Sequence, residues 1–139
     1  MKGKVFIDTN IFIYAHDLDA GRKHDVAKNL LESAWQEENG AISTQVLQEF
    51  YVNVTRKIPN PLPAVQARSI IEPYRAWHLE INDFESIVMA SELAERHRLS
   101  FWDAMIVVAA CRAKALKIVT EDLKHGQIIE GVLLENPFL

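Results

Sequence analysis

The sequence predicts an α/β fold, a three-layer α/β/α sandwich around a central parallel sheet of four to five short strands. Short apolar segments alternate along the chain with longer segments whose apolar residues recur at helical spacing. Strands that alternate with helices form a parallel sheet joined by right-handed crossovers, with helices on both faces. About half of the 139 residues are hydrophobic (49%), which suits a single compact domain over residues 1–139.

The first part of the chain is predicted to hold two strands, each followed by helix. Residues 5–7 (VFI) form a short strand buried on both faces, and a helical stretch over 11–16 follows. The next helix is expected to stop at Gly40. Residues 41–43 form the second strand, and another helix begins directly after it. The apolar stripes of these two longer helices are Val26, Ala27, Leu30, Leu31, Ala34 and Trp35, then Val46, Leu47, Phe50, Tyr51 and Val54.

A proline-rich segment divides the chain near its middle. The three prolines in residues 58–64 (IPNPLPA) cannot continue a helix. The segment over 64–77 is expected to be a helix that bends or ends near Pro73. Residues 78–81 (HLEI) are then predicted to form the third strand.

The last part of the chain repeats the alternation. A helix is expected after Asn82 or Asp83 as its N-cap, and a fully apolar helix begins near Ser100. Residues 117–120 (KIVT) form the fourth strand, and 131–139 hold a short fifth strand. The first of these helices is marked by Phe84, Ile87, Val88, Ser91 and Ala94.

Composition excludes several classes of protein. Cys111 is the only cysteine, so an intrachain disulfide framework is excluded and a buried thiol in a reducing compartment is expected. The sequence shows neither a signal-peptide pattern nor a transmembrane-length apolar run, and a soluble cytoplasmic protein is expected. The net charge of −4 argues against tight, purely electrostatic binding to nucleic acid.

Four acidic residues are predicted to meet at the carboxyl edge of the sheet. Asp8 ends the first strand, and Glu49 lies in the second turn of the helix after the second strand. Asp103 opens the apolar helix, and the strand that follows this helix returns the chain to the same edge at Asp122. Each acid also has a purely structural interpretation as a helix cap, a solvated helix position or a turn residue. Those interpretations do not explain why four elements each bring one carboxylate to one edge.

Clustered carboxylates indicate a divalent cation, because they repel one another unless a cation neutralises them. Oxygen ligands favour Mg²⁺ or Mn²⁺ over Zn²⁺. The reaction that follows most directly is phosphodiester hydrolysis by metal-activated water, with RNA or DNA as substrate.

Four segments together resemble the PIN domain family in order and spacing from Lys4 to Gln127: FIDTN, STQVLQEF, LSFWDAMIVVAA and IVTEDLKHGQ. The resemblance implies a parallel α/β/α sandwich and a Mg²⁺- or Mn²⁺-dependent ribonuclease. The implied catalytic and metal-binding residues are Asp8, Glu49, Asp103 and Asp122, supported by Thr9, Asn10 and Thr120. The sequence departs from the family pattern in an extra acid, Glu121, followed closely by Lys124 and His125, of which His125 is expected to be a surface residue.

The chain is most similar to the VapC-like toxin branch of this family, endoribonucleases that a small antitoxin protein neutralises. This resemblance implies an RNA substrate, an antitoxin partner and a homodimer. Tyr74, Trp77 and the apolar residues near the proline-rich segment are either contacts in that dimer or ordinary core residues.

Three other interpretations remain open at this stage. A haloacid-dehalogenase phosphatase has a second Asp two residues after its nucleophile, whereas Asn10 stands at that position here. A response-regulator receiver needs a phosphoacceptor Asp after its third strand, where only Asp83 is available. A catalytically silent PIN scaffold would bind RNA or a protein without cutting, although all four acids are present.

Overall fold

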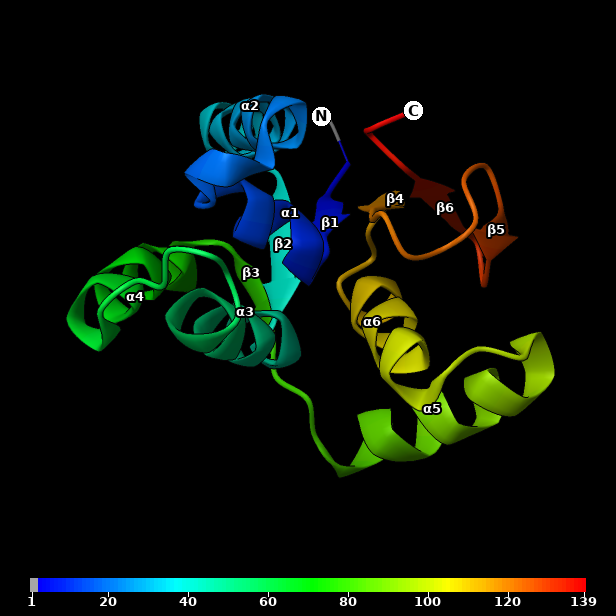
Figure 1. Ribbon diagram of the computed structural model, residues 1–139. Helices are drawn as coiled ribbons and strands as arrows, with labels where there is room; N and C mark the ends of the chain where they lie inside the picture. The colour runs from blue at the N-terminus through cyan, green and yellow to red at the C-terminus, as the bar shows by residue number, and fades with distance from the viewer. Residues whose placement is uncertain (1–2) are drawn as a thin grey trace.

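The computed structural model describes residues 3–139, and over this range the chain forms a six-stranded sheet between two layers of helices (Figure 1). The strand order is β3-β2-β1-β4-β6-β5, and every neighbouring pair is parallel except β5 and β6. The strands are β1 Val5–Ile7, β2 Gly40–Ser43, β3 His78–Glu80, β4 Lys117–Val119, β5 Ile128–Ile129 and β6 Val132–Glu135. The fold is therefore the predicted α/β/α sandwich, with six strands rather than four to five.

The helices divide between the two faces of the sheet. In Figure 1, α1 to α4 lie on one side of the central strands, and α5 and α6 lie on the other. The α-helices are α1 Thr9–Ala15, α2 Arg22–Glu37, α3 Thr44–Arg56, α4 Ala64–Ile71, α5 Phe84–His97 and α6 Phe101–Arg112. Two short 3₁₀ helices accompany them, η1 Leu18–Ala20 and η2 Glu72–Ala76.

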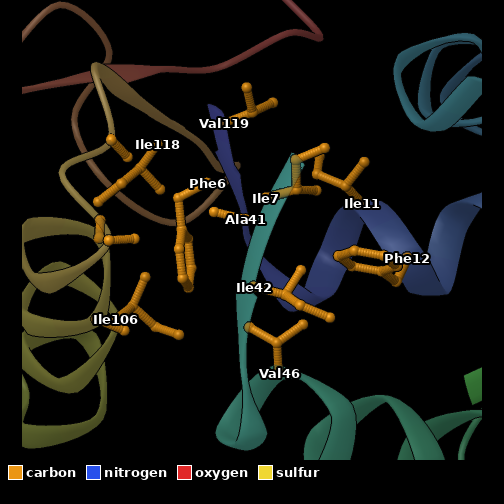
Figure 2. Packing of buried hydrophobic residues seen from close by; sticks show 14 of the residues in the cluster. Phe6, Ile7, Ile11, Phe12, Ala41, Ile42, Val46, Ile106, Ile118 and Val119 are labelled. Atoms are coloured by element: carbon orange, nitrogen blue, oxygen red, sulfur yellow. The ribbon is translucent and has the colours of Figure 1, made fainter. Parts of the chain in front are cut away.

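The central strand β1 is buried on both faces because its side chains alternate between the two helical layers. Figure 2 shows Phe6 directed toward Ile106 on α6, whereas Ile7 is directed toward Ile11 on α1. All four of these side chains are at most 2% exposed. This packing on both faces fixes the position of β1 along the sheet. It therefore also fixes the position of Asp8, the residue that follows β1.

The end of α2 and the role of Gly40 differ from the prediction. Glu38, with φ of 53°, adopts the left-handed conformation and ends α2. Gly40 instead begins β2, and a Cβ atom there would lie 2.5 Å from the Trp77 ring. Glycine is needed here for close approach of the indole, not for stopping the helix.

Tyr74 and Trp77, for which dimer contact and core packing were both open, belong to the core. Tyr74 is 6% exposed and Trp77 is 8% exposed. Their rings pack against each other at a centroid distance of 4.9 Å, and both also pack against Phe12. Of the two open interpretations of these residues, core packing is therefore confirmed.

The apolar residues that mark α5 do not all face the core. The side of α5 that packs inward carries Ser86, Ala90 and Leu93, whereas Phe84 and Ile87 are exposed. Cys111, expected to be buried, is only half-buried on α6.

No helix within residues 3–139 is long and apolar enough to cross a membrane.

Candidate active site

Asp8 lies where β1 leaves the sheet and α1 begins. Its Oδ1 accepts a 2.7 Å hydrogen bond from the backbone N–H of Thr9, and its Oδ2 accepts a 2.8 Å bond from the Thr120 hydroxyl. Asp8 is the N-cap of α1 and is only 4% exposed. The structural interpretation of Asp8 as a cap is therefore confirmed. It does not exclude a role in the site, because the capping carboxylate is also part of a pocket wall.

The surroundings of Asp8 disfavour its ionised form. Burial raises the pKa of Asp8 to about 6, and the hydrogen bonds from Thr120 and Thr9 only partly oppose this rise. The negative charges of Asp122 and Glu49 raise the pKa further. Three of the four predicted acids thus interact electrostatically at one edge of the sheet.

Glu49 reaches this edge from the second turn of α3. The Thr9 hydroxyl donates a 2.7 Å hydrogen bond to Glu49 Oε1, and so joins the start of α1 to α3. The cap of α3 is Ser43, whose hydroxyl accepts from the Val46 N–H at 3.4 Å. Helix α3 begins directly at the end of β2, which brings its second turn close to the end of β1.

Asp122 follows β4 and is held by two neighbouring residues. Asn10 Nδ2 donates to Asp122 Oδ1 at 3.2 Å, and the Asp122 N–H donates to the Thr120 hydroxyl at 3.1 Å. Partial burial raises the pKa of Asp122, the bond from Asn10 opposes this, and the charges of Asp103 and Glu121 add to the rise. Asp122 is therefore electrostatically coupled to the acid on α6.

Asp103 lies in the first turn of α6. Ser100 is the N-cap, and its hydroxyl accepts a 3.1 Å hydrogen bond from the Asp103 N–H. The helix thus begins near Ser100, as predicted. Asp103 is nevertheless beside the other acids, because α6 begins at the same edge of the sheet.

The four acids line one pocket with a volume of about 250 Å³. Thr9 and Asn10 also line the pocket. Thr120 does not line it, but its hydroxyl is hydrogen-bonded to Asp8 and to the backbone of Asp122. The predicted convergence of four carboxylates on one edge is thus observed. The remaining lining residues are Ile13, Tyr14, Gln45, Asn53, Trp102 and Ile106.

Comparison with known proteins agrees with this geometry. The family model of the PIN domain matches residues 5–129, nearly the whole chain. The chain belongs to the PIN domain family. No curated protein matches it.

Solved structures similar to this PIN domain include components of toxin–antitoxin systems. A toxin–antitoxin complex from Klebsiella pneumoniae is 25% identical, with a TM-score of 0.68 over 96% of this chain and 98% of that chain. The VapBC2 complex from Rickettsia felis, bound to a DNA fragment from its promoter, is 25% identical, with a TM-score of 0.64 over 95% and 97% of the two chains. VapC20 from Mycobacterium tuberculosis, a toxin that cleaves the sarcin–ricin loop, is 21% identical, with a TM-score of 0.67 over 86% and 90%.

The extra acid of this PIN domain, Glu121, is not among the residues that line the pocket. It accepts a 2.5 Å hydrogen bond from the Tyr14 hydroxyl and forms an ion pair with Lys23. Burial alone would raise the pKa of Glu121, but the hydrogen bonds from Lys23 and Tyr14 bring it below its usual value. Glu121 thus supports the wall of the pocket through Tyr14. His125 is exposed, as expected, and its Nδ1 accepts from the Asn136 N–H.

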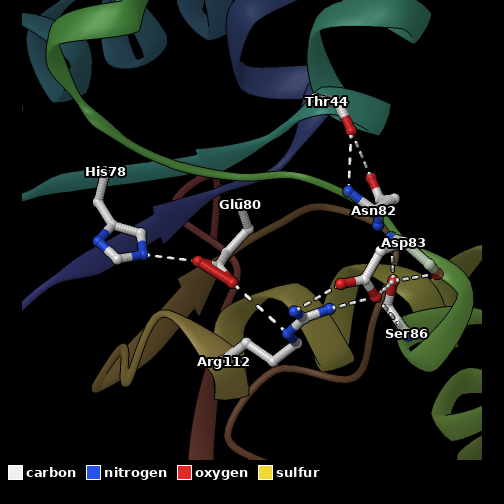
Figure 3. A network of polar contacts seen from close by, with 7 residues as sticks. All are labelled: Thr44, His78, Glu80, Asn82, Asp83, Ser86 and Arg112. Carbon is white, nitrogen blue, oxygen red and sulfur yellow. Dashed lines mark hydrogen bonds and ion pairs between the residues drawn. The ribbon is translucent and has the colours of Figure 1, made fainter.

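Asp83, the residue that a receiver domain would need, belongs to a separate polar network (Figure 3). It is the N-cap of α5 and forms a capping box with Ser86. Both of its carboxylate oxygens accept bonds from Arg112, at 2.8 and 2.9 Å. A carboxylate occupied in this way is a structural cap, so the geometry does not support a receiver.

Sequence reasoning missed a polar row on α3 beside Glu49. Gln45, Glu49 and Asn53 are spaced four residues apart and therefore share one face of the helix, and all three line the pocket. The same spacing relates Asn10 to Tyr14 on α1. This periodicity was visible in the sequence, but the apolar stripe of α3 was the stronger pattern.

The donor set of the pocket suits a hard cation that keeps part of its water shell. Within residues 3–139, no three His, Cys, Asp or Glu side chains lie close enough together to hold a metal ion by themselves. The bonds from Thr9 and Asn10 hold Glu49 and Asp122 in place at the wall. Mg²⁺ can bind through one or two carboxylates while retaining several water molecules, so carboxylates that form no closed protein cage are compatible with it.

Proposed function

We propose that this PIN domain is a Mg²⁺- or Mn²⁺-dependent endoribonuclease that cleaves single-stranded RNA. The observation that supports the proposal is the convergence of Asp8, Glu49, Asp103 and Asp122, from four separate segments, on one pocket. Helix caps alone require no such convergence. The raised pKa of Asp8 further supports it, since neighbouring acids contribute to that rise.

All four acids would hold the cation in this proposal: Asp8, Glu49, Asp103 and Asp122. Thr120, Thr9 and Asn10 orient the carboxylates through the hydrogen bonds described above. The bound cation supplies activation of water and stabilisation of the negative charge that develops on the phosphate.

We further propose that the protein is the toxin of a toxin–antitoxin pair and forms a homodimer in the cytoplasm. The support for the toxin assignment is its similarity to the toxin–antitoxin complexes from K. pneumoniae and R. felis over nearly the full length of each matched chain. The partner in this proposal is a small antitoxin protein.

Cleavage of a fluorogenic single-stranded RNA tests the proposed activity. Wild type should cleave it with Mg²⁺ or Mn²⁺ and should stop when the cation is chelated. Asp8→Asn and Asp103→Asn should each lower the rate about a hundredfold or more, because a misplaced cation forfeits several kcal/mol of transition-state stabilisation. Asp25→Asn, an exposed acid on α2, is the matched control and should retain full activity. Equal cleavage by all variants would exclude the proposed mechanism and point to a contaminating nuclease.

A further inference from the structure

The pocket offers little attraction for the phosphates of a nucleic acid. Four of the residues that line it are acids, and no Lys, Arg or His within residues 3–139 contributes to its lining. The chain as a whole carries a net charge of −4. Phosphate contacts normally supply most of the affinity for nucleic acid, so a strand that binds here needs another source of affinity beside the cation.

Trp102 offers such a source at the same pocket. It precedes Asp103 on α6, lines the pocket and is 62% exposed. The other two tryptophans, Trp35 and Trp77, are 37% and 8% exposed. Tryptophan is highly buried on average in folded proteins, so an indole left in water beside a polar pocket is an informative exception.

One contact fixes the backbone of Trp102 and another packs against its ring. Gln45 Nε2 donates a 3.2 Å hydrogen bond to the Trp102 carbonyl, which joins α3 to the first turn of α6. The Phe101 ring packs edge-on against the indole, with a centroid distance of 5.2 Å and an interplanar angle of 76°. Gln45 is buried, and within the described chain its Oε1 has no hydrogen-bond partner. Gln45 thus connects α3 to the start of α6 from a buried position.

We propose that Trp102 is the base-stacking platform of this site, on which an unpaired base next to the scissile phosphate stacks. The inference rests on the proposed function and extends it to the mode of substrate binding. Every base presents a π-face, so a single indole binds single strands with little sequence preference, whereas the bases of a duplex already stack on each other. Gln45 is a positioning residue that acts through the Trp102 backbone.

Binding measured without cleavage tests this proposal. The Asp8→Asn protein, in chelator, is titrated with a fluorescein-labelled single-stranded oligoribonucleotide and followed by anisotropy. Adding Trp102→Ala should weaken binding about tenfold, and adding Trp102→Phe should weaken it less, because a smaller ring remains. Phe84→Ala is the matched control, since Phe84 is an aromatic side chain on α5 that is 75% exposed and does not line the pocket. The Phe84→Ala control should bind the single-stranded oligonucleotide with the same affinity as the Asp8→Asn parent. A duplex of the same sequence should bind the Trp102→Ala variant and the parent with equal affinity.

Tryptophan fluorescence provides a second readout on the same samples. The oligonucleotide should quench the emission of the Asp8→Asn protein, and Trp102→Phe should remove most of that quenching. Unfolding by urea confirms that the Trp102 variants are folded, as expected for an exposed side chain. Gln45→Leu, which keeps the volume but loses the bond to the Trp102 carbonyl, should weaken single-strand binding and leave duplex binding unchanged.

The outcomes separate this inference from the proposed function. If wild type does not cleave RNA but single-strand binding depends on Trp102, the nuclease proposal fails and the stacking platform is supported. If wild type cleaves RNA, while Trp102→Ala binds single strands within twofold of its parent and quenching persists in Trp102→Phe, the stacking proposal is overturned. Unchanged RNA binding together with a changed sedimentation coefficient would also overturn it, and would assign Trp102 to a protein contact.

Discussion

The Thr120 hydroxyl donates a 2.8 Å hydrogen bond to Asp8 Oδ2 and thereby joins the carboxyl ends of β4 and β1. Both residues are buried, with Thr120 fully inaccessible and Asp8 4% exposed. The same hydroxyl accepts the N–H of Asp122 at 3.1 Å. One threonine therefore orients two of the four acids.

We predict that Thr120→Val impairs both stability and activity. Valine has nearly the same shape, but it leaves Asp8 Oδ2 and the Asp122 N–H without their partner in a buried site. The free energy of unfolding should fall by about 1 to 3 kcal/mol, the usual cost of an unsatisfied buried polar group. RNA cleavage should fall about tenfold or more, because the acids lose their orientation.

Thr120→Ser is the matched control for this prediction. Serine retains the hydroxyl, so it should keep most of the activity while losing a methyl contact. Urea unfolding and initial cleavage rates, measured on the same preparations, give both quantities. Equal activity of the valine and serine variants would show that the bond to Asp8 has no role in catalysis.

The raised pKa of Asp8 predicts an unusual pH dependence of stability in the metal-free protein. The pKa of Asp8 is about 6 in the folded protein, compared with the ordinary value of 3.8, which applies to the unfolded chain. Between these values the folded protein binds more protons than the unfolded chain, so the contribution of Asp8 to stability decreases as pH rises through this range. The full decrease is about 3 kcal/mol, and it is complete above the folded pKa.

The difference between wild type and Asp8→Asn isolates the titration of Asp8 together with its interaction with Asp122 and Glu49. Urea unfolding in chelator should show wild type losing stability relative to the variant as pH is raised from about 4 to about 7. The lowered pKa values of Asp83 and Glu121 act in the opposite direction, but they are common to both proteins and cancel in the difference. A difference that stays constant over this range would mean that Asp8 ionises like a solvated acid.

Much of the fold followed from the sequence because buried strands and helix caps are local signals. The strand over residues 5–7, the cap at Asp83 and the third strand all lie close to their predicted positions. The strand β5 was not predicted, because two residues carry no periodicity and its pairing with β6 depends on the turn between them. The role of Gly40 depends on Trp77, far away in sequence, and local rules therefore misassigned it.

The acids of the pocket were predictable because the carboxyl ends of parallel strands meet at one edge. The hydrogen-bond partners of each acid could not be predicted from the sequence. The bond from Thr9 to Glu49 spans 40 positions, and that from Thr120 to Asp8 spans 112. The exposure of Trp102 likewise depends on how the start of α6 packs against α3, which no spacing within one helix reveals.

We predict that an antitoxin inhibits this protein by inserting an Arg or Lys into the pocket. No basic residue within residues 3–139 contributes to the pocket lining, so its acids are open to a charged partner. A cation bonded to Asp8 or Asp103 would form charge-assisted hydrogen bonds and displace the metal. Replacing that Arg by Gln in the antitoxin should restore RNA cleavage in the complex. A complex whose partner leaves all four acids uncovered, yet blocks cleavage, would contradict this mode of inhibition.

We predict that Asp8→Asn stabilises the metal-free protein and weakens its response to Mg²⁺. In chelator, Asp8 lies buried beside the negative charges of Asp122 and Glu49. Removing one charge should raise the free energy of unfolding near neutral pH by about 0.5 to 2 kcal/mol, the usual gain from neutralising a destabilised functional site. The gain is smaller than the full pH effect because an amide is a weaker acceptor for the bonds from Thr9 and Thr120.

Thermal and urea unfolding of both proteins, with chelator and with millimolar Mg²⁺, tests this prediction. Wild type should gain stability from Mg²⁺ because the cation binds only the folded state, and Asp8→Asn should gain less. Asp25→Asn again serves as the control and should respond to Mg²⁺ as wild type does. If Asp8 were only the N-cap of α1, asparagine would replace it at almost no cost and Mg²⁺ would affect both proteins equally. An unchanged stability in chelator, together with no gain from Mg²⁺ in wild type, would therefore leave the four acids with purely structural roles and remove the physical basis of the proposed nuclease.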